Sequence, residues 1–338
     1  MTRRTRGRVR GIVLLLVSLP LLVALVEAVS FQSRNRNNGS LDSGGETREY
    51  LLYVPKTHDA TKPTPLVISL HGGALWPAAQ RDISRWNALA DEQGFIVVYP
   101  AGAGRARHRV WRVNRGPGLP RDVQFIADLI DTLRAAYNID PARIYADGLS
   151  NGAGMAFVLS CTLSDRIAAV GMVASALLLP PEWCADRRPV PMIAFHGTAD
   201  PITPYAGGTT WVVPPALPDV PTFVSKWARR NGCAATPGDS VVATDVTRRA
   251  YTKCEGDAAV VLYTIQGAGH SWPGGRPVPE WFAGPTSRTI DATREMWAFF
   301  GDHPLATPSP HSAALAFHAR AHRSKSASRH ARTALQSP

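Results

Sequence analysis

The sequence lacks the motifs by which proteins bind nucleotide phosphates. It contains no Gly-Lys-Ser or Gly-Lys-Thr step, which excludes a P-loop. The stretch AGAGRAR at 101–107 follows an expected strand, but Arg107 stands where a dinucleotide-binding loop needs its third glycine. No spacing of cysteine and histidine is typical of a zinc site. We therefore expect neither a nucleotide cofactor nor a metal ion.

Acidic residues are missing from both ends of the chain. Residues 1–10 contain five arginines and no acids, and the segment from residue 303 onward contains five basic residues and no acids. The ends carry ten of the eleven net positive charges, which leaves +1 for residues 11–302. A nearly neutral body argues against a nucleic-acid partner. Residues 303–338 also have few large apolar side chains, which predicts a disordered basic tail.

Charge is absent from residues 12–26, an apolar run that follows the N-terminal arginines. Small side chains come soon afterwards, in the sequence VEA at 26–28, and the whole pattern predicts a cleaved signal peptide over residues 1–28. An uncleaved N-terminal anchor is the alternative, because the run approaches the roughly 20 residues that span a bilayer. We expect a secreted, periplasmic or cell-envelope protein. Residues 29–46 are polar and rich in glycine, serine and asparagine, which predicts a linker.

Cysteine is scarce, with four residues in the chain: Cys161, Cys184, Cys233 and Cys254. An even number in an exported chain predicts two disulfides, for which three pairings are possible. Nearest-neighbour pairing, Cys161 with Cys184 and Cys233 with Cys254, is the simplest. Four buried thiols are the alternative.

Residues 47–302 alternate between strand and helix patterns without an internal repeat. This predicts one α/β domain with a mostly parallel sheet and helices on both faces. The apolar side chains of residues 121–137, for example, recur at helical spacing. Strands are expected over 47–55, 65–73, 95–100, 142–148, 167–175, 191–197 and 258–265, and helices over 121–137, 151–161 and 286–300.

Residues 148–152 read GLSNG, between an expected strand and an expected helix. This is the context of a nucleophile elbow, in which a sharp turn presents the serine hydroxyl and flanking glycines avoid a clash. We therefore predict that Ser150 is a nucleophile rather than an ordinary loop serine. A second part of this prediction concerns Asn151. It opens the helix, so its backbone N–H is a candidate oxyanion donor.

A serine nucleophile needs a base and an acid, which follow it in the order Ser, Asp, His in this type of fold. Asp200 and His270 each come just after an expected buried strand, and we predict that they complete a triad with Ser150. His196 lies in the strand before Asp200, and we interpret it as a structural residue. The motif LHGG at 70–73 predicts the second oxyanion donor, at Gly73 rather than Gly72.

Four tryptophans lie in the expected strand-end loops: Trp76, Trp111, Trp272 and Trp281. Such residues are candidates for an apolar or aromatic substrate-binding wall. Simple packing is the alternative for each of them.

Seven separated motifs together resemble a known family: LYVP, PLVISLHGG, RDVQFIADLIDTL, YNIDPARIYADGLSNGAGMAFVL, HGTADPITPY, GHSWPGG and IDATREMWAFF. Over residues 47–301 the chain resembles the secreted poly(3-hydroxybutyrate) depolymerase and feruloyl esterase family. The resemblance implies an α/β-hydrolase fold and a carboxylic-ester hydrolase, with Ser150, Asp200 and His270 at the matching triad positions. It also implies a disulfide between Cys233 and Cys254.

The chain departs from this family in two ways. No cysteine precedes Cys161, so a lipobox is absent and a lipid anchor is not expected. The tail is too short and polar for a polymer-binding domain, which puts degradation of solid polymer in doubt.

We thus expect a serine esterase that acts through an acyl-enzyme on short-chain hydroxyalkanoate or feruloyl and acetyl-type esters. The partner is a small-molecule or oligomeric ester, with no membrane contact beyond a possible N-terminal anchor, and the oligomeric state stays open. One alternative is an acyltransferase with a sugar or lipid acceptor. The other is a non-catalytic surface-binding homologue, which would lack a triad member.

Overall fold

The computed structural model describes residues 30, 32–33, 35–104, 109–114, 116–176, 184, 188–210 and 216–306. The predicted signal peptide over 1–28 and nearly all of the predicted tail lie outside these residues. The chain divides into a unit that ends at Pro304 and a second unit that begins at Leu305. Only Leu305 and Ala306 of the second unit are described. In the part of the chain that is described, no helix has both the length and the hydropathy needed to cross a bilayer.

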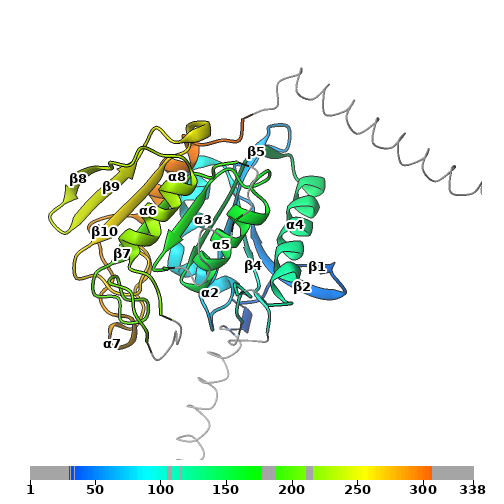
Figure 1. Ribbon diagram of the computed structural model, residues 1–338. Helices are drawn as coiled ribbons and strands as arrows, with labels where there is room; N and C mark the ends of the chain where they lie inside the picture. Colours follow the sequence, from blue (N-terminus) through cyan, green and yellow to red (C-terminus); the bar gives the residue numbers. More distant parts are fainter. Residues whose placement is uncertain are drawn as a thin grey trace, which may run out of the picture. The chain divides into compact units, whose positions relative to one another are not determined.

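A ten-stranded sheet forms the centre of the first unit, in the order β1-β2-β4-β3-β5-β6-β7-β10-β9-β8 (Figure 1). The six strands from β4 to β10 pair in parallel, and the strands at both edges pair antiparallel. Continuous apolar runs such as LVISL and IVVYP are fully buried, as parallel strands covered on both faces require. The bounds are β1 Gly39–Ser43, β2 Glu46–Tyr53, β3 Thr64–Leu70, β4 Ile96–Pro100, β5 Ile139–Leu149, β6 Val170–Val173, β7 Met192–Gly197, β8 Gly238–Ala243, β9 Val246–Tyr251 and β10 Val260–Ile265.

Helices cover the sheet on both faces. Figure 1 shows α4, α5 and α6 in front of the strands, and their apolar side chains share one core cluster with the sheet. Helices α3 and α8 contact each other, and Phe300 of α8 stacks on Trp86 of α3 and on Tyr145 of β5. The bounds are α2 Pro77–Ser84, α3 Trp86–Gln93, α4 Leu119–Ala136, α5 Asn151–Thr162, α6 Val220–Arg230, α7 Glu280–Ala283 and α8 Ala292–Gly301, with a 3-10 turn at Glu255–Asp257.

The seven expected strands and three expected helices are all present, but the predicted linker over 29–46 is wrong at its C-terminal end. Residues 39–43 form β1, which pairs antiparallel with β2 through a two-residue turn of Gly44 and Gly45. Both glycines have positive φ angles, which this kind of hairpin turn requires. The polar, glycine-rich composition that suggested a linker is the composition of a solvated edge hairpin.

The four cysteines form two disulfides, Cys161–Cys184 and Cys233–Cys254. These are the nearest-neighbour pairs. The first joins the last turn of α5 to residue 184, and the second joins the segment after α6 to the 3-10 turn. Each closes a loop of just over twenty residues.

Candidate active site

Ser150 lies between the end of β5, a central strand, and the start of α5. Its backbone has φ 54° and ψ −118°, a conformation that costs an L-residue energy and that clusters at functional sites. A side chain at Gly148 would clash with the backbone of Gly152, and one at Gly152 would clash with the carbonyl oxygen of Leu70. The sequence Gly-x-Ser-x-Gly therefore forms this turn because only glycine fits on either side.

Asp200 and His270 lie in the loops that follow β7 and β10. Because β5, β7 and β10 are parallel, the loops after them meet at one edge of the sheet. The two side chains are in contact, with His270 Nδ1 2.8 Å from Asp200 Oδ2. An ionised carboxylate can only accept, so Nδ1 carries the proton and donates it. In the neutral imidazole, the second ring nitrogen, Nε2, is then a hydrogen-bond acceptor.

The Asp200 carboxylate is buried and fully hydrogen-bonded. Its Oδ1 accepts from the backbone N–H groups of Ile202 and Thr203, each at 2.8 Å. The Thr203 hydroxyl and His196 Nε2 lie 2.9 Å and 3.4 Å from Oδ2. Burial alone would raise the pKa of Asp200, but the hydrogen bonds and charges of His196 and His270 outweigh it and hold that pKa well below its usual range. The acid is therefore ionised at neutral pH.

His196 has the structural position that its sequence context suggested. Its ring is buried in β7, and Nε2 donates to the carbonyl oxygen of Thr203 at 2.7 Å. This bond fixes the loop that carries Asp200.

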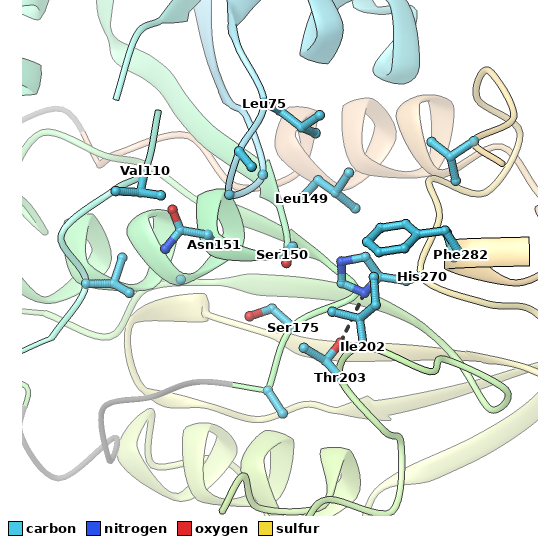
Figure 2. Close-up of a pocket in the computed structure, with 18 of the residues that line it drawn as sticks. Leu75, Val110, Leu149, Ser150, Asn151, Ser175, Ile202, Thr203, His270 and Phe282 are labelled. Atoms are coloured by element: carbon cyan, nitrogen blue, oxygen red, sulfur yellow. Dashed lines mark hydrogen bonds between the residues drawn. The ribbon is translucent and has the colours of Figure 1, made fainter. Parts of the chain in front are cut away.

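Ser150 and His270 line the same cavity. Figure 2 shows the Ser150 hydroxyl and one ring nitrogen of His270 facing each other across it. No direct hydrogen bond joins them among the interactions of the described residues. Bonds of this kind are often long in free enzymes and tighten only when substrate is present.

The loop Gly72–Gly73 follows β3 and lies against the turn at Ser150. A Cβ added at Gly72 would be 3.7 Å from Ser150 Cβ, and one added at Gly73 would be 3.6 Å from Asn151 Cβ. Within the described ranges, the backbone N–H groups of Gly73 and Asn151 donate to no other backbone group. Both residues line the cavity. Two N–H donors are thus available beside the Ser150 hydroxyl.

His71 immobilises this loop, a role that sequence reasoning missed. Its ring is fully buried, its Nδ1 donates to the Gly72 carbonyl oxygen at 2.7 Å, and its Nε2 accepts from the Gly102 N–H at 2.9 Å. Burial lowers the pKa of His71 to about 4, so the ring is neutral at physiological pH. The Gly72 carbonyl belongs to the same planar peptide as the Gly73 N–H. His71 therefore also fixes the direction of that N–H.

The cavity has a volume of about 620 Å³ and is lined mainly by apolar side chains. Figure 2 shows Phe282 and Ile202 beside His270, with Leu75 and Leu149 on the side of Ser150. Further apolar lining residues are Val110, Val113, Leu217 and Val278. Such a cavity favours an uncharged substrate group.

The predicted wall of tryptophans is wrong: none of the four is among the described lining residues. Trp111 and Trp272 are buried, and their indole N–H groups donate to the His71 carbonyl oxygen and to Thr293. Trp76 is half-buried and donates to Asn35. Trp281 is 88% exposed on α7, whereas its neighbour Phe282 lines the cavity. Aliphatic residues and Phe282 line the cavity instead.

The chain is similar in sequence to known esterases. The family model for esterase PHB depolymerase matches residues 48–179. The chain is 30% identical to "Putative esterase NocK" of Nocardia uniformis subsp. tsuyamanensis over 268 residues, which cover 73% of this chain and 77% of that protein. It is 31% identical to feruloyl esterase B of Piromyces equi over 231 residues, which cover 66% of this chain but only 42% of that protein.

Among solved structures, the acetyl xylan esterase from Aspergillus awamori is similar, with a TM-score of 0.53 and 17% identity. The match covers 75% of this chain and 94% of that one. An identity this low shows a shared fold, which is the α/β-hydrolase fold expected from the sequence. The matches in sequence show that the chain belongs to the esterase PHB depolymerase family.

Proposed function

We propose that the protein is a carboxylic-ester hydrolase that forms an acyl-enzyme on Ser150. The observation that carries the proposal is the convergence of three loops on one apolar cavity. They bring together a serine in a strained turn, a histidine whose free nitrogen faces it, and a buried carboxylate that holds that histidine. A serine alcohol is a weak nucleophile, and this arrangement supplies the base that it needs.

In the proposed mechanism, His270 Nε2 accepts the Ser150 proton as the serine oxygen attacks the ester carbonyl. Asp200 keeps the imidazole in the required tautomer and stabilises its positive charge. The N–H groups of Gly73 and Asn151 donate to the oxyanion of the tetrahedral intermediate. His270 then protonates the leaving alcohol. Water, activated by the same histidine, finally hydrolyses the acyl-enzyme.

The substrate class follows from the lining of the cavity and from the relatives. An aliphatic cavity of this size accepts an uncharged acyl group. Similar proteins are named feruloyl esterase, bifunctional acetylxylan esterase/xylanase and poly(3-hydroxyalkanoate) depolymerase. We infer that the esters are small or oligomeric ones of the hydroxyalkanoate, feruloyl or acetyl type. The two disulfides support an exported protein, because such bonds persist in oxidising compartments.

The test is hydrolysis of p-nitrophenyl butyrate by the purified protein and by Ser150→Ala and His270→Ala. We expect each variant to lose at least about 10³-fold in kcat/KM, since members of a triad act as a unit. An acyl-enzyme also predicts a burst of nitrophenol in the first turnover. A phosphonate ester should label the tryptic peptide that contains Ser150.

The control is Ser225→Ala on α6, whose hydroxyl donates to its own helix away from the cavity. This variant should keep the full rate and the full burst. Equal residual rates in the parent, Ser150→Ala and His270→Ala would contradict the proposed function. A phosphonate adduct on a residue other than Ser150 would contradict the assignment of the nucleophile.

A further inference from the structure

Among the described residues that line the cavity, one polar side chain has no role in the proposed mechanism. The polar side chains in this described lining are those of Ser150, Asn151, Ser175, Thr203 and His270. Four are engaged or reactive. Both amide atoms of Asn151 bind the backbone of Trp111, and the Thr203 hydroxyl lies within hydrogen-bond distance of Asp200. Only the hydroxyl of Ser175 remains to be explained.

Ser175 is half-buried, and its hydroxyl makes no hydrogen bond with the part of the chain that the structure describes. Figure 2 shows its side chain between Asn151 and Thr203, below Ser150, with the hydroxyl in the cavity. Most of the surrounding surface is apolar. The hydroxyl is not enclosed by protein, so it is accessible to a ligand in the cavity.

The backbone on either side of Ser175 is held firmly. Ala174 precedes it and has φ 51°, a left-handed conformation that is unfavourable for an alanine. The Ala174 N–H donates to the Phe195 carbonyl oxygen at 2.9 Å, and the Ala174 carbonyl oxygen lies 3.0 Å from the Thr203 hydroxyl. The fold therefore maintains an unfavourable turn whose result is to direct Ser175 into the cavity.

Ser175 is also close to the bond that reacts. Strands β5 and β6 are neighbours, with Leu149 opposite Val173, and the Ser150 N–H donates to the Val173 carbonyl oxygen at 2.8 Å. Ser175 is thus two residues beyond the residue that holds the nucleophile in place. Ser175 follows β6 by two residues, and Figure 2 shows its side chain near Ser150 in the same cavity, where an ester bound at Ser150 would lie.

We propose that Ser175 is a specificity-determining residue that hydrogen-bonds a hydroxyl group on the second or third carbon of the acyl chain. The ligand class is therefore the short hydroxyacyl ester, and Ser175 distinguishes it from the unsubstituted alkanoate. This proposal rests on the proposed esterase function and names the substrate feature that the same site selects. The rest of the acyl chain contacts the aliphatic wall. Recognition thus comes from a single polar contact in an otherwise apolar cavity.

The test compares ethyl butyrate with ethyl 2-hydroxybutyrate and with each enantiomer of ethyl 3-hydroxybutyrate, by pH-stat titration of the full-length protein. The measured quantity is the ratio of kcat/KM for a hydroxy ester to kcat/KM for ethyl butyrate. Comparing this ratio between parent and variant cancels the intrinsic reactivity of each ester. We expect Ser175→Ala to lower it for at least one hydroxy ester by roughly 2- to 12-fold, the equivalent of one net hydrogen bond.

Ser175→Thr, which keeps a hydroxyl, should restore most of the ratio, while Ser225→Ala should match the parent. Thermal melts of all variants show whether they are folded. Equal ratios in the parent and in Ser175→Ala would overturn the role of Ser175, although the esterase function would stand. The same ratio is measured for methyl 4-hydroxycinnamate against methyl cinnamate. If Ser175→Ala changes only this aromatic ratio, the assignment to short hydroxyacyl chains is overturned. A parent that hydrolyses none of these esters would overturn both proposals.

Discussion

Asp147 should make the stability of the fold depend on pH, and Asp147→Asn should remove that dependence. The residue lies in β5, three positions before Ser150, and has no solvent exposure. Its Oδ1 accepts from the Ser69 hydroxyl at 2.7 Å, whereas Oδ2 has no hydrogen-bond partner among the described residues. Burial raises the pKa of Asp147 to about 8, and the Ser69 hydroxyl and the Trp86 indole oppose this only in part.

The sign and size of the effect follow from this pKa. Between the ordinary pKa of 3.8 and about 8, the unfolded chain has lost the Asp147 proton while the folded protein keeps it. The free energy of unfolding therefore falls by about 1.4 kcal/mol for each pH unit as the pH rises. The contribution is fully present below pH 3.8. It amounts to roughly 5–6 kcal/mol over the whole window, and it is lost once the pH passes about 8.

His71 has the opposite effect in part of this window. Its pKa falls from 6.5 to about 4 on folding, so between these values the unfolded chain binds a proton that the folded protein does not. Stability from His71 thus rises with pH up to about 6.5 and is constant above it. The range from pH 6.5 to 8 isolates Asp147. Over these 1.5 pH units its contribution should fall by about 2 kcal/mol.

The assay is urea unfolding at 25 °C between pH 6.5 and 8, at constant ionic strength and without reductant. Asp147→Asn keeps the side-chain volume and an oxygen for Ser69, but it cannot ionise. Between pH 6.5 and 8, the free energy of unfolding of the parent should fall by about 2 kcal/mol more than that of Asp147→Asn. The control, Asp302→Asn, changes an exposed carboxyl at the end of α8 and should follow the parent. Parallel curves for the parent and Asp147→Asn would refute the reasoning.

Three further variants test other parts of the site. His71→Leu removes the bond to the Gly72 carbonyl oxygen and the bond from the Gly102 N–H that anchors the ring; kcat for p-nitrophenyl butyrate should fall roughly 10- to 100-fold with KM little changed, and an unchanged kcat would show that the loop needs no such support. Thr203→Val removes the hydroxyl that lies within hydrogen-bond distance of both the Ala174 carbonyl oxygen and the Asp200 carboxylate and should cost about 1–3 kcal/mol in urea unfolding, whereas Thr203→Ser should cost less. Gly152→Ala places a methyl group against a backbone carbonyl and should yield little folded protein on size-exclusion chromatography, while a well-folded, active Gly152→Ala would contradict the packing described for the turn.

The sequence predicts those parts of the fold that can be recognised from one short segment alone. Buried parallel strands are continuous apolar runs, so PLVISL and FIVVYP were recognisable without their neighbours. The order of Ser150, Asp200 and His270 was recognisable because each follows a strand of this kind. The edge hairpins were missed. In β8 the residues from Gly238 to Val242 are all exposed, so the strand shows no contrast between a buried and a solvated face.

The lining of the cavity could not be predicted, because it depends on contacts between segments far apart in the chain. Ser175 was an ordinary serine at the end of an expected strand, and only the positive φ angle of Ala174 and the position of Ser150 give it a role. The prediction that the four tryptophans line the cavity was wrong for the same reason. A large side chain near the site can pack beneath the loops as readily as it can face substrate. Burial, which separates the two cases, is a property of the assembled fold.

Trp111 shows what such a residue contributes when it does not touch substrate. The two proposed oxyanion donors, Gly73 and Asn151, belong to segments nearly eighty residues apart. The Trp111 indole N–H donates to the His71 carbonyl oxygen beside the first donor, and its backbone N–H and carbonyl oxygen are both bound by the Asn151 side chain at the second. One residue thus links both donor segments, and the His71 ring packs against its indole. The spacing between two N–H groups must match a single oxyanion, so a rigid connection between them matters more here than another apolar contact in the cavity.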